Sequence, residues 1–507
     1  MTMTMMAPTM FGALILFMII GFPVAFSLAA LGFTFAFWAI SLGFFKPEFM
    51  TNIPLSISGV LANELLLSIP FFTFMGAILE RCGLAEDLLE GTGQLFGSRP
   101  GGLGYAVIIV GAILGAITGT VAASVIAMGV ISLPVMLRYG YNQRFATGVI
   151  AASGTITQVI PPSLVLVVLA DQMGKSVGDM YKGAIGPSIL QVSIFLLYVF
   201  FLSKFKPHYL PPLPPEARTL QGWPLYRKVL AGMVPSVALI FLVLGTIFAG
   251  WATPTEAGAM GAVGAMVLAA MNKRLTWPLV WEGMQSTMRL TAMVVFILLG
   301  SRVFSIVFNG VDGNLWIEHM LTGLPGGQLG FLITVNIFVF FLAFFLDFFE
   351  IAFIIVPLLA PVADKLGINL IWFGVLLCVN MQTSFMHPPF GFALFYLRGI
   401  APKEVASKEI YLGAIPWVIM QLMLVAVVIF WPASVTYWLD KDTSVDIDKV
   451  KLDIPIEDQR KEAKDPALEM MQQNGGATAP TTPAPADKKD PAKAMMDSAA
   501  KDGAKKP

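Results

Sequence analysis

The sequence predicts an all-α polytopic membrane protein with two related halves, each containing a re-entrant helical hairpin and a proline-broken helix. Of its 507 residues, 56% are hydrophobic and 13% are charged, and the mean hydropathy is positive. Such values lie far from those of soluble domains. The apolar runs leave room for roughly a dozen membrane segments of about 20 residues each. A stretch of the first half also recurs without a gap in the second half.

The composition excludes several classes of function. The formal net charge of 0 favours neither nucleic acid nor an acidic partner. Cys82 and Cys378 lie in or beside apolar runs without a CxxC spacing, so we expect no disulfide framework, no redox chemistry and no metal site beyond coupling ions. An intramembrane enzyme could use Asp347 and Glu350 as an acid/base pair. The three histidines are not clustered, and HExxH and GxSxG motifs are missing from the sequence, so we expect a protein that is not an enzyme.

The N-terminal run is expected to be a retained first membrane segment. It has no basic n-region and stays apolar to about Ile40, longer than the apolar region of a signal peptide. Lys46 is the first charged residue, and the positive-inside rule therefore places the N-terminus outside and Lys46 inside.

Changes in composition divide the rest of the chain. Residues 204–228 are basic and proline-rich, and we expect them to be a cytoplasmic link between a first half (1–203) and a second half (229–439). Residues 440–507 are charged and rich in Ala and Pro; this tail cannot bury a core and should be disordered. After the first run, apolar segments occupy 54–80, 103–137, 145–171, 186–203, 229–250, 254–271, 286–310, 330–362, 370–397 and 413–438.

Two apolar segments have lengths that fit neither one helix nor two complete spans. As a single helix, residues 103–137 would be about 50 Å long, against a hydrocarbon core of about 30 Å. The same holds for residues 330–362. A re-entrant hairpin of two half-helices fits both segments, with an irregular tip that is buried in protein or faces a water-filled cavity. One long tilted helix, or one helix with an apolar extension, is the alternative.

Polar residues in the middle of each long segment favour the hairpin. The first carries GAITGTVAAS, with Thr118, Thr120 and Ser124, and the second carries FFLDFFEIAF, with Asp347 and Glu350 one helical turn apart. Carboxylates at that depth are costly and are associated with ions, protons or a basic partner. Alternatively, the carboxylates lie at a helix end in interfacial water, and the hydroxyls bond back to their own helix or line close helix packing.

An internal repeat relates the segments that follow the two hairpins. PVMLRYGYNQRFATGVIAASGTITQVIPPS begins at Pro134, and PVADKLGINLIWFGVLLCVNMQTSFMHPPF begins at Pro361. The first proline precedes the double proline by 27 residues in both copies. Each copy is followed by a GAI element. Paired interrupted segments in corresponding positions indicate a transporter binding site at the repeat interface. The equivalent residues include Arg138 and Lys365, Gly140 and Gly367, Asn142 and Asn369, and Thr157 and Ser384.

The double prolines explain the polar residues that precede them. Pro161 with Pro162, and Pro388 with Pro389, break a helix and leave backbone carbonyls without intrahelical partners. These carbonyls and nearby hydroxyls can coordinate a small cation such as Na⁺, and half-helix N-termini can face an anionic substrate. The hydroxyls in question belong to Thr155, Thr157, Thr383 and Ser384.

Several motifs, in their proper order, resemble the large membrane subunit of tripartite ATP-independent periplasmic (TRAP) transporters. They are IPFFTFMGAILERCGL, GAITGTVAASVIAMG, AASGTITQVIPPS, ATPTEAGA, FLDFFE and HPPFGFALFYLRGIAP, within residues 10–438. The resemblance implies two inverted repeats, a scaffold and a mobile transport domain of the elevator type, in the bacterial inner membrane. It also implies uptake of organic acids coupled to Na⁺, with a small four-helix membrane subunit and a periplasmic solute-binding protein as partners. The tail then has no part in transport.

The motifs FFLDFFEIAF, VNMQTSF and PPFGFALFYLRG resemble those of the subgroup named for mannitol and chloroaromatic compounds. This resemblance favours a small monocarboxylate or 2-oxo acid as the substrate. Thr118 and Thr120 stand where much of the family has serines, and both keep a hydroxyl. His387 stands where many members have threonine; it is either a substrate contact, a pH-sensitive element or a packing residue. Arg398 could bind a substrate carboxylate or snorkel at a helix end.

We therefore expect cations at the polar links and hairpin tips, and substrate between the tips. A stand-alone Na⁺- or H⁺-coupled carboxylate symporter without a binding protein is the alternative. The expected cation-binding residues are Thr118, Gly119, Thr120, Gly154, Thr155, Thr157, Asp347, Gln382, Thr383 and Ser384. The expected substrate-binding residues are Ser124, Ser153, Ser163, Glu350, Asn380, His387 and Arg398.

Overall fold

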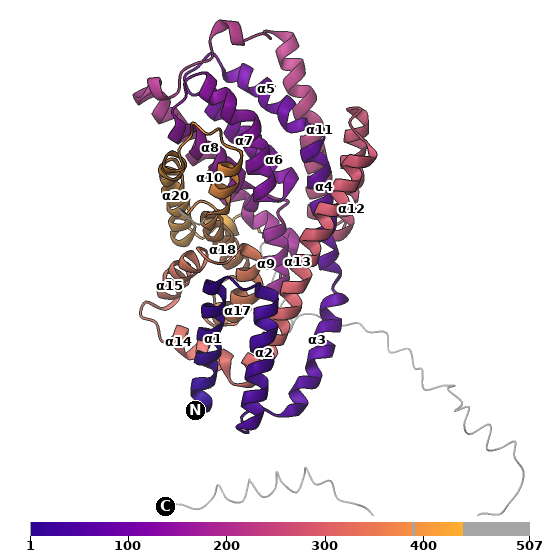
Figure 1. Cartoon of the computed structure of the whole chain (residues 1–507), viewed down its shortest axis with the longest axis vertical. Coiled ribbons are helices and arrows are strands. Elements are labelled where there is room, and N and C mark those ends of the chain that lie inside the picture. The colour runs from indigo at the N-terminus through magenta and orange to yellow at the C-terminus, as the bar shows by residue number, and fades with distance from the viewer. Residues whose placement is uncertain (1, 388–390, 440–507) are drawn as a thin grey trace, which may run out of the picture. The chain divides into compact units, whose positions relative to one another are not determined.

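The chain is helical throughout the part that the structure describes, residues 2–387 and 391–439 of a computed structural model (Figure 1). No strand occurs among these residues, which confirms the all-α prediction. The predicted tail, 440–507, and the second double proline, Pro388 and Pro389, lie outside the described residues.

Ten α-helices form the first half. Between them lie short 3₁₀ helices, η1 (Pro47–Thr51), η2 (Glu64–Leu67) and η3 (Ile156–Gln158). The α-helices are α1 (Met3–Ile20), α2 (Val24–Ser41), α3 (Asn52–Leu61), α4 (Ser68–Arg81), α5 (Leu84–Phe96), α6 (Gly102–Thr118), α7 (Val121–Arg138), α8 (Gln143–Thr155), α9 (Leu164–Gln172) and α10 (Val177–Phe205).

The link between the halves contains only η4 (Pro207–Tyr209) and η5 (Pro215–Ala217). In the second half, the π-helical η6 (Ile351–Ile355) connects α16 to α17. Its α-helices are α11 (Trp223–Phe248), α12 (Pro254–Met271), α13 (Trp277–Gly310), α14 (Gly313–Thr322), α15 (Gly327–Leu342), α16 (Phe348–Glu350), α17 (Val356–Lys365), α18 (Leu370–Ser384), α19 (Phe392–Ile400), α20 (Ser407–Phe430) and α21 (Ala433–Thr436).

The lengths of the helices identify membrane spans. By length and composition, 8 described helices can cross a membrane, or up to 10 if each of two bent pairs is one span. One bent pair, Pro47–Leu61 with Glu64–Arg81, turns by 47°, and the other, Gly313–Thr322 with Gly327–Leu342, turns by 116°. By contrast, α18 has 15 residues and is only about 22 Å long, too short to cross a core of about 30 Å. The chain is therefore a multi-pass membrane protein with interrupted helices.

The N-terminal run forms two helices, so the expectation of a single segment was wrong. The first helix, α1, ends at Ile20, and Gly21 adopts the left-handed conformation with φ of 88°. Pro23 precedes α2, which begins at Val24. Because Gly21 and Pro23 interrupt an apolar run, hydropathy alone did not reveal the break. The prediction that the N-terminus lies outside assumed a single membrane crossing before Lys46. Because two helices precede Lys46, this prediction is no longer supported.

Equivalent residues of the two repeats have the same local structure. Gly140 and Gly367 both adopt the left-handed conformation, with φ of 79° and 72°. Asn142 accepts hydrogen bonds from the backbone amides at the start of α8, and Asn369 does the same for α18. The side-chain oxygen of each asparagine thus satisfies amides that have no partner within the helix.

The two halves interlock in a crosswise manner. We define the first crossover as α8, η3 and α9. Its last helix, α9, packs against α16, η6 and α17 of the second half. The second crossover consists of α18 and α19, and its last helix, α19, packs against α7 of the first half. Helix α20 packs extensively on α8, so helices coloured orange and purple lie side by side in Figure 1. Each half therefore completes the packing of the other.

Small residues bring α2 and α13 into close contact, as is common between membrane helices. A Cβ added at Gly32 would lie 2.9 Å from Val303 Cγ1, and one added at Gly300 would collide with the Ala25 carbonyl oxygen. The second contact is with backbone, which has little freedom to move.

We expect Gly300→Ala to destabilise the protein by about 1–3 kcal/mol, because the added methyl overpacks α2 against α13. Thermal unfolding in detergent measures the change. Gly12→Ala in α1 is the matched control, since no atom lies within 4 Å of the position that its added methyl would take. Gly12→Ala should be neutral or slightly stabilising, and equal melting temperatures for the two variants would contradict the tight α2–α13 contact.

Candidate functional site

The first hairpin consists of α6 and α7, which pack against each other. Helix α6 ends at Thr118, whose side chain lies outside what the structure describes. Gly119 then turns the chain with φ of 63°, and Thr120 is the extended N-cap residue of α7. The Thr120 side chain does not cap the helix, and Ser124 is fully buried one turn later. The tip therefore presents a helix C-terminus and an uncapped helix N-terminus side by side.

Glycines bring the first hairpin close to the first crossover. A Cβ added at Gly111 would lie 2.6 Å from the Ser153 Cβ, and one added at Gly115 would lie 3.0 Å from the Thr157 Cα. A Cβ on Gly154 would lie 3.1 Å from both the backbone nitrogen and the Cα of Val125. The hairpin and the broken end of α8 are thus in backbone contact.

Tyr141, between α7 and α8, joins the start of α8 to the start of α6. Its hydroxyl accepts a hydrogen bond of 3.2 Å from the Leu103 amide at the start of α6. Burial raises the pKa of the Tyr141 phenol to about 12, so the phenol stays neutral and this contact is independent of pH in the physiological range.

The hydroxyl groups of the first crossover are buried and bond to nearby carbonyls. Ser153 donates to Val149 O at 2.7 Å, Thr155 to Ala152 O at 2.9 Å, and Thr157 to Gly154 O at 3.0 Å. Ser163, the extended residue before α9, donates to Gln158 O across the break. The oxygens of Ser153, Thr157 and Ser163 keep lone pairs after donating their protons, so these side chains remain able to accept a hydrogen bond or coordinate a cation. The two lone pairs of the Thr155 oxygen face amide groups from the second half instead.

The second crossover repeats this pattern. Thr383 donates to Asn380 O at 2.7 Å, and Ser384 donates to Met381 O. Asn380 donates to Asn336 O at 2.8 Å and so joins α18 to α15, the first arm of the second hairpin. Gln382 is fully buried, and its Oε1 has no partner among the described residues.

Asp347 and Glu350 form a reciprocal cap at the tip of the second hairpin. The Asp347 carboxylate accepts a hydrogen bond from the Glu350 amide at 2.9 Å, and the Glu350 carboxylate accepts one from the Asp347 amide at 3.0 Å. Carboxylates at a helix N-terminus also interact favourably with the helix dipole. Asp347 lies 227 residues after Thr120, the offset of the repeat, and both are extended N-cap residues. The two tips are therefore equivalent in structure but differ in charge.

His387 and Arg398 have different surroundings from the hydroxyl residues. The His387 ring lies 4.2 Å from the Phe340 ring and 4.4 Å from the Phe344 ring, and it is 2% exposed. Neither ring nitrogen has a hydrogen-bond partner in the part of the chain that the structure describes. Arg398 is exposed at the end of α19 and donates to Val405 O at 2.6 Å, a contact within its own loop.

The two crossovers meet at equivalent residues. Gln382 lies 227 residues after Thr155, and its Nε2 is 3.4 Å from the Thr155 Oγ1. The Cys378 thiol also donates to Gln158 O at 3.2 Å. Equivalent positions of two repeats can touch only near the axis that relates them, so this axis passes close to Thr155 and Gln382. The broken ends of both helices are thus gathered at one buried place.

Sequence reasoning missed one residue of this cluster, Gln421 on α20. Its Nε2 lies 3.0 Å from the Thr155 Oγ1 and 3.6 Å from the Met386 sulfur, and the residue is 1% exposed. A signal was present in the sequence, because the GAI element is followed at the same distance by a glutamine in both halves. These glutamines are Gln191 and Gln421.

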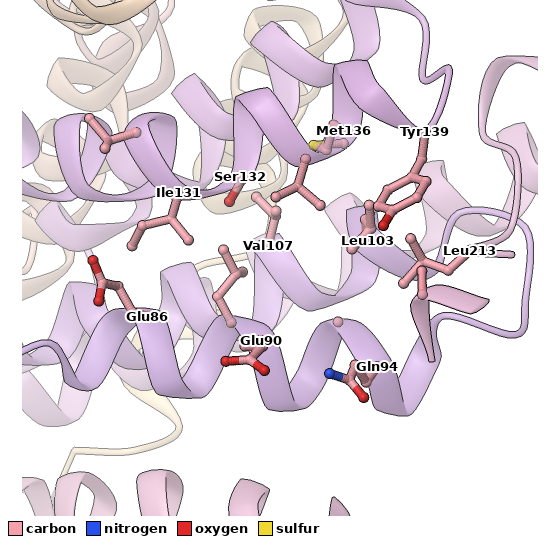
Figure 2. A pocket seen from close by; sticks show the side chains of 15 residues that line it. Glu86, Glu90, Gln94, Leu103, Val107, Ile131, Ser132, Met136, Tyr139 and Leu213 are labelled. Carbon is pink, nitrogen blue, oxygen red and sulfur yellow. The ribbon is translucent and has the colours of Figure 1, made fainter. Parts of the chain in front are cut away.

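A separate cavity lies outside this cluster of buried polar residues. It has a volume of about 400 Å³ and is lined by α5, α6, α7 and the link between the halves (Figure 2). Figure 2 shows Glu86 and Glu90 on α5, which forms one wall of the cavity, and Ile131 on the opposite wall. Glu90 forms an ion pair with Lys228 at 2.6 Å. None of the predicted cation- or substrate-binding residues lines this cavity.

Comparisons with known proteins identify the family. Residues 11–434 match the model of the "Tripartite ATP-independent periplasmic transporter, DctM component". The chain is 31% identical to the C4-dicarboxylate TRAP transporter large permease protein DctM of Rhodobacter capsulatus, covering 85% of this chain and 98% of the relative. It is 26% identical to the 2,3-diketo-L-gulonate TRAP transporter large permease protein YiaN of Escherichia coli, covering 82% and 94%.

Among solved structures, the Alcanivorax borkumensis YdaH transporter shares the fold. Its TM-score is 0.55 at 15% sequence identity, over 76% of this chain and 88% of that chain. The family model spans the helices that form both hairpins and both crossovers. The chain therefore belongs to the DctM family of tripartite ATP-independent periplasmic transporters and is a large permease subunit, a transport protein and not an enzyme.

Proposed function

We propose that this permease imports a small organic acid, driven by a Na⁺ gradient, across the bacterial inner membrane. A periplasmic solute-binding protein delivers the substrate, and a small four-helix membrane subunit completes the complex. The observation that carries the proposal is the meeting of two interrupted helices at equivalent, buried, polar residues, Thr155 and Gln382. Such sites at a repeat interface bind substrate and coupling ions in secondary transporters.

The helix ends at this place suit a cation and an anion together. Helices α6, α8 and α18 end there, and the carbonyls of their last turns carry partial negative charge that attracts a cation. Helices α7 and α9 begin there without side-chain caps, so their amide groups can bind a carboxylate. We assign Na⁺ to the predicted cation-binding residues, with Thr155 contributing its backbone carbonyl because its hydroxyl bonds to Gln382 and Gln421. We assign the substrate to the hydroxyl and amide residues between the tips.

Packing supports an elevator motion of this site. The first hairpin contacts the first crossover through Gly111, Gly115 and Gly154, and Asn380 ties the second crossover to the second hairpin. Hairpins and crossovers joined in this way, together with α20, which packs closely on α8, would move as one body and carry the site across the membrane past the other helices.

The substrate class follows from chemistry and from relatives. Uncapped helix N-termini favour an anion, and the relatives' names include C4-dicarboxylate, 2,3-diketo-L-gulonate and isethionate, all organic anions. We favour a small monocarboxylate or 2-oxo acid. The basic link between the halves and the C-terminal tail would lie in the cytoplasm, according to the positive-inside rule.

Uptake into proteoliposomes tests the function. The chain and its small partner subunit are reconstituted, and a panel of radiolabelled carboxylates is supplied with or without the solute-binding protein and an inward Na⁺ gradient. We expect uptake only when both are present. Uptake that is driven by the gradient without a binding protein would indicate a stand-alone symporter, and uptake that ignores Na⁺ would refute the coupling.

Asp347→Asn separates the charge of the second tip from its capping role. Asparagine caps a helix as well as aspartate does, so we expect the thermal stability to stay unchanged. Removing the negative charge should raise the half-saturating Na⁺ concentration about tenfold or more in the uptake assay. Glu350→Gln, which also keeps the capping box, is the control for the second carboxylate. Normal Na⁺ dependence in both variants would show that the pair is structural.

A further inference from the structure

Gln421 is one of the few polar side chains of α20, a helix of 24 residues that lies outside both hairpins and both crossovers. Its amide nitrogen contacts the first crossover at Thr155 and the second at Met386, the residue before His387. Its Oε1 has no hydrogen-bond partner among the described residues. Buried polar groups are normally hydrogen-bonded, so a buried amide that contacts both crossovers while its oxygen lacks a partner indicates a role other than packing.

Close backbone packing places Gln421 within reach of Thr155. A Cβ added at Gly148 of α8 would collide with the Gly413 carbonyl oxygen of α20, and one added at Gly413 would collide with the Arg144 carbonyl oxygen. Thr155 and Gln421 follow these two glycines by 7 and 8 residues, so they lie on the same helix faces about two turns further along. At the end of α8 and α20 nearer Gly148, Arg144 forms a bidentate ion pair with Glu409, at 2.6 and 3.1 Å.

The other half lacks this arrangement although it has the same glutamine. Gln191 on α10 occupies the equivalent place and is also 1% exposed, but neither atom of its amide has a partner within the described chain. The residues at the helix contact also differ. Gly148 has Val375 as its equivalent in the second crossover, and a Cβ on Gly183 of α10 would lie 3.5 Å from the Val375 Cγ2. The valine side chain separates α10 from α18 where two glycines join α8 to α20.

We propose that Gln421 is a positioning residue that sets the affinity of the first crossover for the coupling cation. Its hydrogen bond fixes the Thr155 hydroxyl, and with it the last turn of α8 whose carbonyls face the break. Gln421 itself does not touch the cation. This inference rests on the proposed Na⁺ coupling. It adds that Gln421, which lies outside the repeat segments, maintains the geometry of one cation site. Loss of this hydrogen bond leaves the broken end free to move, which weakens cation binding.

The test compares two identical residues in equivalent helices. Gln421→Leu, Gln191→Leu and wild type are reconstituted with the small subunit, and initial uptake is measured against Na⁺ concentration at saturating binding protein and solute. We expect Gln421→Leu to raise the half-saturating Na⁺ concentration about threefold to tenfold, the effect of losing one buried hydrogen bond. The maximal rate at saturating Na⁺ should stay within about twofold, and Gln191→Leu should change neither value by more than about twofold.

Thr155→Val removes the acceptor and provides a second route to the same answer. It should raise the half-saturating Na⁺ concentration at least as much as Gln421→Leu does, because it also removes the contact with Gln382. The double variant should show no further increase over Thr155→Val, because Gln421 acts through the Thr155 hydroxyl. If Gln421→Leu is not recovered as a folded protein, judged by gel filtration in detergent, Gln421→Met against Gln191→Met decides the matter.

Two results overturn the proposal while leaving the transport function intact. One is a half-saturating Na⁺ concentration for Gln421→Leu that equals that of Gln191→Leu. The other is a lower maximal rate for Gln421→Leu with no change in Na⁺ dependence, which would indicate a purely structural role. If wild-type uptake itself ignores Na⁺, the proposed coupling fails, and this inference fails with it.

Discussion

The structure depends on one constraint: a helix that is interrupted inside a membrane must find new partners for its freed backbone groups. The chain meets it by burying the first break, and the described residues that lead into the second, in protein. Hydroxyl side chains such as Thr157 and Thr383 bond to carbonyls near each break, and Ser163 bonds across the first. Glycines of the first hairpin let its backbone approach the first break closely. The same polar groups that make the interruption tolerable also make it suitable for binding ions.

Crosswise packing makes the two halves dependent on each other. Each crossover begins against its own hairpin, through Gly154 in one half and Asn380 in the other, and ends against the hairpin of the opposite half. A change at either tip is therefore transmitted through direct contacts to both. This arrangement suits the proposed ion-coupled function, in which substrate and ion bind together before the site moves.

Symmetry in the fold coexists with asymmetry in the chemistry. Thr120 and Asp347 are equivalent N-cap residues, but only the second tip carries charge, which forms a capping box with Glu350. Gly148 and Val375 are equivalent as well, but it is at the glycine that α20 of the opposite half packs closely and its Gln421 reaches the break. Two sites built on one plan can in this way differ in their affinity for cations.

The sequence by itself determined the all-helical membrane class, because hydropathy and run length are properties of local composition. It also determined the equivalent starts of the two crossovers, since the repeat of Asn142 and Asn369, and of Gly140 and Gly367, encodes the same caps and turns. It did not show that the N-terminal run is two helices, because Gly21 and Pro23 hardly change the hydropathy. Only the tertiary structure decided that Thr155 meets Gln382 and that Gln421 joins them, while Gln191 does not. Those contacts depend on how closely whole helices approach, which is set by pairs such as Gly148 and Gly413 that are distant in the chain.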